Sequence, residues 1–308
     1  MCDIWKANQE KREISVELLE QHLQDFKKLG VKQVTLSGGE ALMHSNFWRF
    51  CEALRTIRVK ICLLSTGVTL KNHATEVVRH CNEVIVSLDG SPQVHNAIRN
   101  IPAAFEKLEE GVKALKLADA GFRVSGRTVI QKQNFRDFPL IIQAAKHMGL
   151  NQISFLPADV SSVAFNRSEP WKEEKVSDVA LNREEIAELE AIVKKTFIEF
   201  KQEFEAKFIA ESREKLLDMV QYYRALHNEA EFPIRKCNAP WISAVIESNG
   251  DVLPCFFHKT YGNIHEGRFE EIVNSEKAIN FRKHLNVHAD PICKRCVCSL
   301  HIPAWRTR

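Results

Sequence analysis

Five cysteines gather near the end of the chain at a spacing that suits metal chemistry. Cys237 comes first, Gly250 and Cys255 follow it, and the run CKRCVC then supplies Cys293, Cys296 and Cys298. Four thiolates suit tetrahedral zinc or the irons of an iron–sulfur cluster. A disulfide framework is the competing interpretation. It is disfavoured because the cysteines crowd one end of a long chain in which no signal peptide is recognised. We therefore expect metal or cluster binding.

The N-terminal half carries shorter motifs that could bind a ligand. The chain opens with MCDIW, which contains Cys2, and a β-rich run at 33–37 leads into the sequence SGGE. The residues of this loop are Ser37, Gly38, Gly39 and Glu40. Glycines let the backbone approach a ligand because no Cβ intervenes, and the carboxylate that follows can pair with a cationic ammonium. Taken alone, such a loop is also typical of a tight turn after a strand.

Together with the run VSLDG at 86–90, these features resemble the radical S-adenosylmethionine (radical SAM) enzymes that carry a C-terminal SPASM or Twitch extension. In that family three cysteines of an early CxxxCxxC motif hold a 4Fe–4S cluster, which leaves one iron free for S-adenosylmethionine. A GGE motif on the second strand holds the methionine amino group. The resemblance covers nearly the whole chain, and it implies that Glu40 binds the ammonium of S-adenosylmethionine.

The resemblance also implies cofactor contacts at the ends of later strands. Thr66 falls at one such end. Ser87 and Asp89 resemble positions that contact the ribose and methionine portions, and Arg127 is placed to pair with the methionine carboxylate. For Ser87 and Asp89 the alternative is an N-capping turn before the next helix. For Arg127 the alternative is a solvent-facing arginine at a strand edge.

Cys2 matches only the third cysteine of the family motif. The first two cysteines would precede Met1. One thiolate cannot hold the cluster that three normally hold, so we expect the radical SAM cluster to be incomplete in the chain as written. Either the start lies at an internal methionine of a longer protein, or the chain is a truncated and inactive relative. The first interpretation is favoured because the rest of the motif set is present.

The C-terminal cysteines resemble the Twitch arrangement, with one thiolate before a β-hairpin, one after it and a CxxC returning later. The hairpin is indicated by the apolar run 241–247, the turn Ser-Asn-Gly-Asp at 248–251 and the run 252–257, since Asn-Gly is a strong hairpin signal. We expect the hairpin to bring Cys237 and Cys255 to adjacent strand ends. The ligands implied for an auxiliary 4Fe–4S cluster are Cys237, Cys255, Cys293 and Cys296, with Cys298 able to replace Cys296. Zinc is the alternative, because CxxC pairs bind it readily.

A parallel βα array is expected to position the N-terminal motifs. Strands are expected at 33–37, 60–65, 83–88, 122–130 and 151–156, with helices at 15–29, 71–80, 102–119 and 135–147. Five strands separated by helices indicate a parallel sheet, whose ligands gather at the C-terminal strand ends. One further strand before Met1 gives the six of a radical SAM barrel. We therefore expect an α/β fold, a partial (β/α)6 barrel whose first strand is missing.

Three regions are expected along the chain. The partial barrel occupies residues 1–160. A connection and helical bridge follow at 161–232, with an irregular stretch at 157–180 and a strongly helical stretch at 182–229. The small cysteine-rich SPASM/Twitch-like domain occupies residues 233–308.

Composition excludes several classes of partner. The 43 basic and 40 acidic residues are thoroughly mixed, with a net charge of +3, so no basic tract points to a nucleic acid. No apolar run approaches the ~20 residues that span a bilayer, so no membrane is expected. Nine cysteines without a recognised secretory signal favour a reducing compartment, the cytoplasm. Cys51, Cys62 and Cys81 lie in apolar patterns and are expected in the core.

The function implied by the resemblance is radical chemistry. The protein is expected to cleave S-adenosylmethionine to a 5′-deoxyadenosyl radical that abstracts a hydrogen atom from a peptide or a small molecule. An electron donor such as flavodoxin or ferredoxin is implied. The alternative is a catalytically inactive iron–sulfur or zinc protein that acts as a binding module. His258 and His265 lie near the cysteines, but such histidines are more often loop residues.

Overall fold

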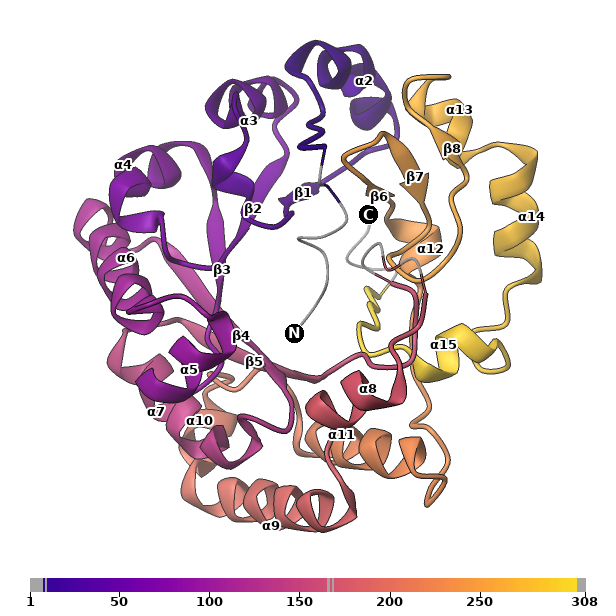
Figure 1. Ribbon diagram of the computed structural model, residues 1–308. Helices are drawn as coiled ribbons and strands as arrows, with labels where there is room; N and C mark the ends of the chain where they lie inside the picture. Colours follow the sequence, from indigo (N-terminus) through magenta and orange to yellow (C-terminus); the bar gives the residue numbers. More distant parts are fainter. Residues whose placement is uncertain (1–7, 9, 165–166, 168, 304–308) are drawn as a thin grey trace.

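The computed structural model describes residues 8, 10–164, 167 and 169–303, and Figure 1 shows their arrangement. Cys2 lies outside the described residues. Five parallel strands form one curved sheet in the order β1-β2-β3-β4-β5. Their bounds are β1 (Gln33–Leu36), β2 (Lys60–Ser65), β3 (Glu83–Ser87), β4 (Arg123–Ile130) and β5 (Gln152–Pro157). The sheet confirms the predicted α/β fold and its five strands.

Helices surround the outer face of this sheet (Figure 1). They are α2 (Val16–Lys28), α3 (Phe47–Thr56), α4 (Leu70–His80), α5 (Pro92–Arg99), α6 (Ala104–Ala118) and α7 (Phe138–His147). Two short 3₁₀ turns, η1 (Ala41–Met43) and η2 (Phe135–Asp137), join strands to helices. The side chain of Ser15 caps α2 by accepting a hydrogen bond from the amide of Leu18 at 3.1 Å. The sequence patterns had not indicated α3 or α5.

The two faces of the sheet differ in character because side chains alternate along each strand. Val84 and Val86 of β3 are fully buried in the core that the sheet shares with the helices. Their neighbours Glu83 and Ser87 lie on the opposite face, and in register with them on β4 are Arg123 and Arg127. The face turned to the centre of the ring therefore carries charged and polar side chains that could contact a ligand.

A close approach of α4 and α6 holds the loop after β2 in place. Gly67 lies in the loop between β2 and α4 and has φ +87°. A Cβ on it would lie 2.3 Å from Cδ1 of Leu108 on α6, which is too close. On α6, a Cβ on Gly111 would lie 2.8 Å from Cβ of Leu70. Glycine at both positions therefore lets the helices pack closely and fixes the backbone next to Thr66.

A helical bridge follows the barrel. It consists of α8 (Glu173–Val179), α9 (Arg183–Glu199), α10 (Lys201–Glu205) and α11 (Arg213–Leu226). Helix α8 lies within the stretch expected to be irregular, so that expectation was wrong for residues 173–179. The hydroxyl of Tyr223 on α11 donates to the carbonyl of Ile130 at 2.5 Å and accepts from the amide of Ala158 at 2.9 Å. These bonds tie the bridge to the ends of β4 and β5.

The cysteine-rich region is built from short elements. They are α12 (Ala239–Ile242), the antiparallel strands β6 (Val245–Ile246), β7 (Asp251–Leu253) and β8 (Gly262–Asn263), and helices α13 (Phe269–Val273), α14 (Glu276–His284) and α15 (Pro291–Arg295). The predicted hairpin is present, and Gly250 occupies its turn with φ +89°. Its second strand ends at Leu253 rather than at 257, because Pro254 has no amide to donate.

This shortening changes the surroundings of two cysteines. Cys237 lies before α12 and Cys255 lies beyond the end of β7, so neither stands at a strand end. The apolar run at 241–247 also begins as helix rather than strand. The loops of this region, rather than its sheet, therefore carry the thiols.

Helix α2 contacts the cysteine-rich region through two buried side chains. His22 Nε2 lies 3.0 Å from the carbonyl of Ile264, and the amide of Phe269 donates to His22 Nδ1 at 3.3 Å. Asp25 is 1% exposed and pairs with the guanidinium of Arg268. Burial opposes ionisation of Asp25, but the hydrogen bonds from Arg268 and from the amide of Glu270 hold its pKa below the usual value.

In the described part of the chain, no helix is both long enough and apolar enough to cross a membrane.

Candidate cofactor-binding sites

The SGGE loop presents one carboxylate at the C-terminal edge of the sheet. Glu40 follows β1, and its Oε2 accepts hydrogen bonds from the amide of Thr66 at 2.8 Å, the hydroxyl of Thr66 at 2.5 Å and the hydroxyl of Ser65 at 3.1 Å. Parallel pairing of β1 with β2 brings these residues together. One oxygen of Glu40 is thus fixed by the neighbouring strand end.

The other oxygen of Glu40 has no hydrogen-bond partner in the part of the chain that the structure describes. Oε1 is buried and makes no hydrogen bond to any described residue. A buried acceptor without a donor is costly and calls for an explanation. A Cβ added to Gly38 or Gly39 would meet no atom within 4 Å, so the loop beside the carboxylate borders open space. The residues therefore fit a ligand that brings a cationic donor, such as the ammonium of S-adenosylmethionine.

Ser87 and Arg127 lie opposite each other on β3 and β4, on the polar face of the sheet. Arg127 is exposed, and its Nε donates to the hydroxyl of Ser154 on β5 at 3.4 Å. Its guanidinium forms no ion pair with a described residue. Arg127 is therefore free to bind an anionic group, and its predicted contact with the methionine carboxylate stays a prediction.

Asp89 lies in different surroundings. Its side chain is fully buried and pairs with Nη2 of Arg99 on α5 at 2.5 Å, while its amide donates to His95 Nδ1 at 3.1 Å. Burial raises the pKa of Asp89, and Arg99 offsets this only in part. These contacts hold Asp89 against α5, but they are not the N-capping alternative, because the N-cap of α5 is Ser91 and no described side chain caps that helix. Its predicted contact with the cofactor stays a prediction.

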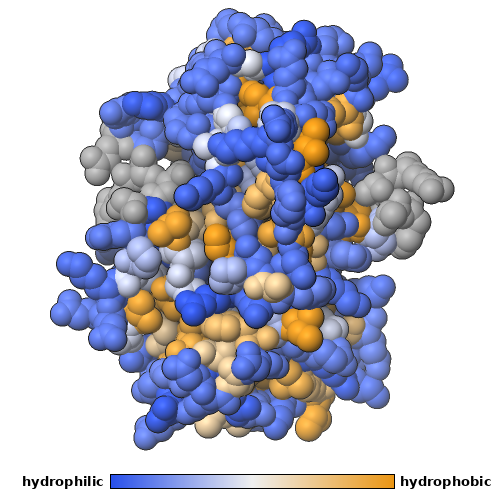
Figure 2. All heavy atoms as spheres, turned by 90° about the vertical axis from the view of Figure 1, so that its right-hand side faces the viewer, coloured by the Kyte–Doolittle hydropathy of each residue, from blue (hydrophilic) through white to orange (hydrophobic). Residues whose placement is uncertain are grey.

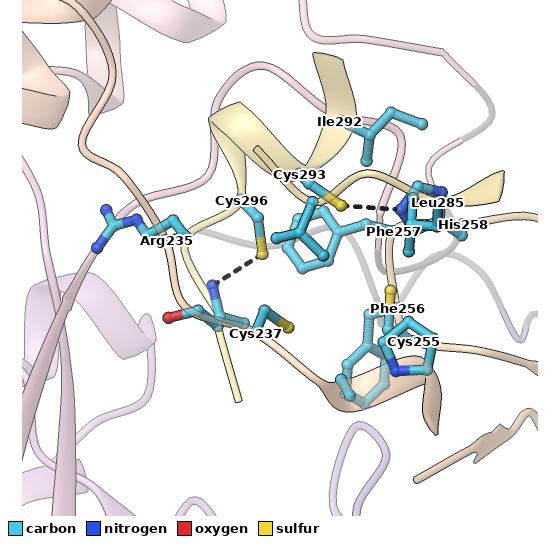
Figure 3. Close-up of a pocket in the computed structure, with 15 residues that line it drawn as sticks. Arg235, Cys237, Cys255, Phe256, Phe257, His258, Leu285, Ile292, Cys293 and Cys296 are labelled. Atoms are coloured by element: carbon cyan, nitrogen blue, oxygen red, sulfur yellow. Dashed lines mark hydrogen bonds between the residues drawn. The ribbon is translucent and has the colours of Figure 1, made fainter. Parts of the chain in front are cut away.

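The second site is a pocket lined by five thiols. Figure 3 shows the sulfurs of Cys237, Cys255, Cys293 and Cys296 directed toward one hollow, which Cys298 also lines. Loops before α12 and after β7 supply the first two, and α15 with the residue that follows it supplies the next two. The eight cysteines among the described residues are all free, so none forms a disulfide there. Cys51, Cys62 and Cys81 are buried, as expected.

The chemistry of this pocket suits a metal group. Apolar side chains, including Phe257, Leu285 and Ile292, line it together with the thiols. Burial raises the pKa of Cys293 to about 12 and raises the pKa of Cys255 and Cys296. A metal that binds here would displace the protons of the thiols. Its positive charge would then balance the negative charge of the thiolates that form. The donor set therefore fits an iron–sulfur cluster.

Nitrogen donors already approach two of the sulfurs. The amide of Cys298 donates to Sγ of Cys296 at 3.3 Å, and Nε2 of His258 lies 3.3 Å from Sγ of Cys293 (Figure 3). The first contact supports Cys296 as the fourth ligand in preference to Cys298, although the choice stays a prediction. His258, Asp290 and Cys293 bring their ligand atoms within 4.8 Å of one another.

Of two further residues at this pocket, His258 was named from the sequence but set aside as a loop residue, and Arg235 was not named. His258 follows Cys255 by three residues, a spacing that could have marked it. Arg235 is 8% exposed, and its Nε and Nη2 have no hydrogen-bond partner among the described residues. Figure 3 shows its guanidinium directed away from the sulfurs. A single arginine two residues before Cys237 carries no recognisable signal.

Two family models match the chain. The model of the radical SAM superfamily matches residues 1–145, and the model of SPASM, an iron–sulfur cluster-binding domain, matches residues 237–297. An AdoMet-dependent heme synthase of Methanosarcina barkeri is 24% identical over 140 residues, which cover 44% of this chain and 40% of that protein. Two proteins of Bacillus subtilis match more of the chain.

The first is the sporulation killing factor maturation protein SkfB, 21% identical over 76% of this chain and 50% of its own length. The second is the antilisterial bacteriocin subtilosin biosynthesis protein AlbA, 23% identical over 82% of this chain and 53% of its own length. The chain thus spans 40% to 53% of the length of these three relatives.

Solved structures share the fold. Native anSMEcpe with bound AdoMet superposes with a TM-score of 0.65 at 17% identity, covering 92% of this chain and 78% of that one. Streptococcus suis SuiB bound to S-adenosylmethionine gives a TM-score of 0.62 at 15% identity, covering 92% and 65%. The parallel sheet, the cysteine pocket and the two family matches lead to one conclusion. The chain belongs to the radical SAM superfamily and carries a SPASM-type iron–sulfur domain, so iron–sulfur clusters and S-adenosylmethionine are its cofactors.

Proposed function

We propose that the whole protein is a radical SAM enzyme that oxidises a peptide. The observation that carries the proposal is the unpartnered Oε1 of Glu40 beside the open glycine loop, in a barrel of this family. When bound, the reduced cluster and S-adenosylmethionine supply methionine and a 5′-deoxyadenosyl radical, which removes one hydrogen atom from the substrate. The protein's own residues bind, orient and shield these groups.

Glu40 orients S-adenosylmethionine in this proposal. Oε2 is held by Ser65 and Thr66, so the carboxylate cannot rotate freely and Oε1 faces the incoming ammonium. Arg127, on the polar face of the sheet, pairs with the methionine carboxylate, and Ser87 lies beside it in register. Two charged contacts of opposite sign fix the direction of an amino acid, because its ammonium and carboxylate cannot exchange places.

Cys237, Cys255, Cys293 and Cys296 hold the auxiliary cluster in this proposal. When bound, that cluster supplies an acceptor for one electron. A substrate that gave up one hydrogen atom, one electron and one proton would be lighter by two hydrogens. The apolar side chains around the pocket shield the thiolates from water.

A peptide is favoured as the substrate because the relatives that match most of the chain are named for peptide products. SkfB and AlbA, which match 76% and 82% of it, are named for the maturation of a killing factor and the biosynthesis of a bacteriocin. The heme synthase matches only 44%. A solved structure of SuiB contains the precursor peptide SuiA, although that likeness is one of fold. A flavodoxin or ferredoxin in the cytoplasm is proposed as the electron donor.

Product analysis tests the proposal. The whole protein, with all three cysteines of its CxxxCxxC motif, is reconstituted anaerobically and receives S-adenosylmethionine and dithionite, alone, with a synthetic peptide library or with a porphyrin. We expect 5′-deoxyadenosine in all three reactions, with a rise on adding peptides and peptide products lighter by two hydrogens. Glu40→Gln should lower the yield, and Glu20→Gln, an exposed position on α2, should not. Absence of 5′-deoxyadenosine, or stimulation by the porphyrin alone, would contradict the proposal.

A further inference from the structure

His258 connects the two cysteine-bearing parts of the pocket. It lies three residues after Cys255, and its Nε2 reaches Sγ of Cys293, 35 residues further along the chain, at 3.3 Å. The imidazole is 7% exposed, and its ring packs edge-on against Phe281 with 5.0 Å between centroids. Packing of this kind fixes the ring, so the contact with sulfur is part of the built pocket.

The geometry makes His258 a donor to that sulfur. An imidazole carries at least one N–H, which can stand on Nε2. Asp290 does not compete for it, because its Oδ1 is 3.9 Å from Nε2 and already accepts from the amides of Ile292 and Cys293 at 2.9 and 2.8 Å. A metal-bound Cys293 is a thiolate and can only accept. The tautomer with its proton on Nε2 then satisfies both groups.

We propose that His258 is a positioning residue that donates an N–H···S hydrogen bond to Cys293 and raises the reduction potential of the auxiliary cluster. The inference shares one assumption with the proposed function, namely that this pocket holds an iron–sulfur cluster. Hydrogen bonds to ligand sulfurs withdraw negative charge and stabilise the reduced cluster, and they are a main determinant of cluster potentials. The four cysteines complete the ligand set, so the imidazole is not needed to hold iron.

Redox titration followed by electron paramagnetic resonance tests this role. All variants are made in a Cys2→Ala background, so that the proposed auxiliary cluster is the one observed. His258→Phe keeps a ring against Phe281 but has no donor, His258→Leu is a second variant without a donor, and His258→Gln keeps an N–H. His288→Phe, at an exposed position of the same domain, is the matched control.

We expect the Phe and Leu variants to retain iron and to shift the reduction equilibrium at least tenfold toward the oxidised cluster, which is about 59 mV for one electron. The Gln and His288 variants should stay close to the unchanged protein. An unchanged potential in the variants without a donor would overturn the proposal. Loss of iron from both the Phe and the Leu variants would overturn it as well, because His258 would then be needed for assembly. Neither result depends on cleavage of S-adenosylmethionine, so failure here is distinct from failure of the proposed function.

Discussion

The barrel and the cysteine-rich region hold their sites in opposite ways. Glu40 stands at the end of a strand, and the next strand supplies the donors for its Oε2. The thiols of the pocket stand on loops and on the end of a five-residue helix, next to strands of two or three residues. Neighbouring strand ends order the first site, whereas loops and short elements carry the second site and fewer contacts hold its thiols.

The two regions contribute unequally to one shared hydrophobic core. Under the barrel helices, Ile61, Leu63 and Val84 are fully buried. In the cysteine-rich region Trp241, Ile279 and Ile292 are 46%, 49% and 40% exposed, and Figure 2 shows separate apolar spots across the face that carries α13, α14 and α15. A region this small cannot bury enough apolar surface by itself. We infer that the bound cluster acts as part of its core.

Removing the metal should therefore give the largest effect. Metal binding contributes on the order of 10 kcal/mol to the folding of small metal-dependent domains. We expect the amides of β7 and β8 to lose their protection from hydrogen exchange in iron-free protein, while the amides of β2 and β3 keep theirs. Hydrogen exchange with mass spectrometry of the loaded and the chelated protein measures this. Equal protection of the β7 amides from exchange in both states would contradict the proposed difference between the barrel and the cysteine-rich region.

Replacing Glu40 by Gln should have the next largest effect, on binding alone. The change keeps the size of the side chain but removes the charge from Oε1, and a charged hydrogen bond contributes about 1.5–3 kcal/mol. In the whole protein, with a complete CxxxCxxC motif, we expect S-adenosylmethionine to bind roughly ten- to a hundred-fold more weakly, with the melting temperature and the iron content unchanged. Isothermal titration beside a thermal melt separates the two quantities, with Glu20→Gln as the control. An unchanged affinity would show that the loop does not bind the ammonium.

The smallest effect is expected at the contact between the two regions. Asp25→Asn removes a buried charge that pairs with Arg268, a residue whose side chain is 57% exposed, so we expect a loss of only about 1 kcal/mol at pH 7. Because the folded-state pKa of Asp25 lies below its ordinary value of 3.8, its contribution is present above that pH and is lost as the pH falls through the folded-state pKa. Urea unfolding of both proteins at pH 7 and below pH 3.8 checks this. A difference that grows at low pH would contradict the assignment.

The barrel could be predicted from local patterns because its elements are long and periodic. The strand expected at 60–65 matches β2, and the helix expected at 71–80 differs from α4 by one residue. The structure also brings Glu40 to the strand edge where ligands were expected. Helices α3 and α5 were not indicated, and Cys2 and the strand expected before Met1 lie outside what the structure describes.

The cysteine-rich region was predicted less completely, for a physical reason. Its elements β8, α13 and α15 have two to five residues each, too few for a hydrophobic period to show. The cysteine spacing still indicated a common pocket, because the identity of the ligands does not depend on secondary structure. The contact of His258 with Cys293 joins residues far apart in the sequence, so only the folded chain shows it.

The metal content of single cysteine variants tests the central claim most directly. The protein is reconstituted anaerobically in the Cys2→Ala background, and iron and zinc are counted per chain. The account predicts about four irons in the parent, loss of that iron in Cys255→Ala and full retention in Cys62→Ala, whose thiol lies buried in the barrel. One zinc per chain in the parent, or unchanged iron in Cys255→Ala, would contradict it.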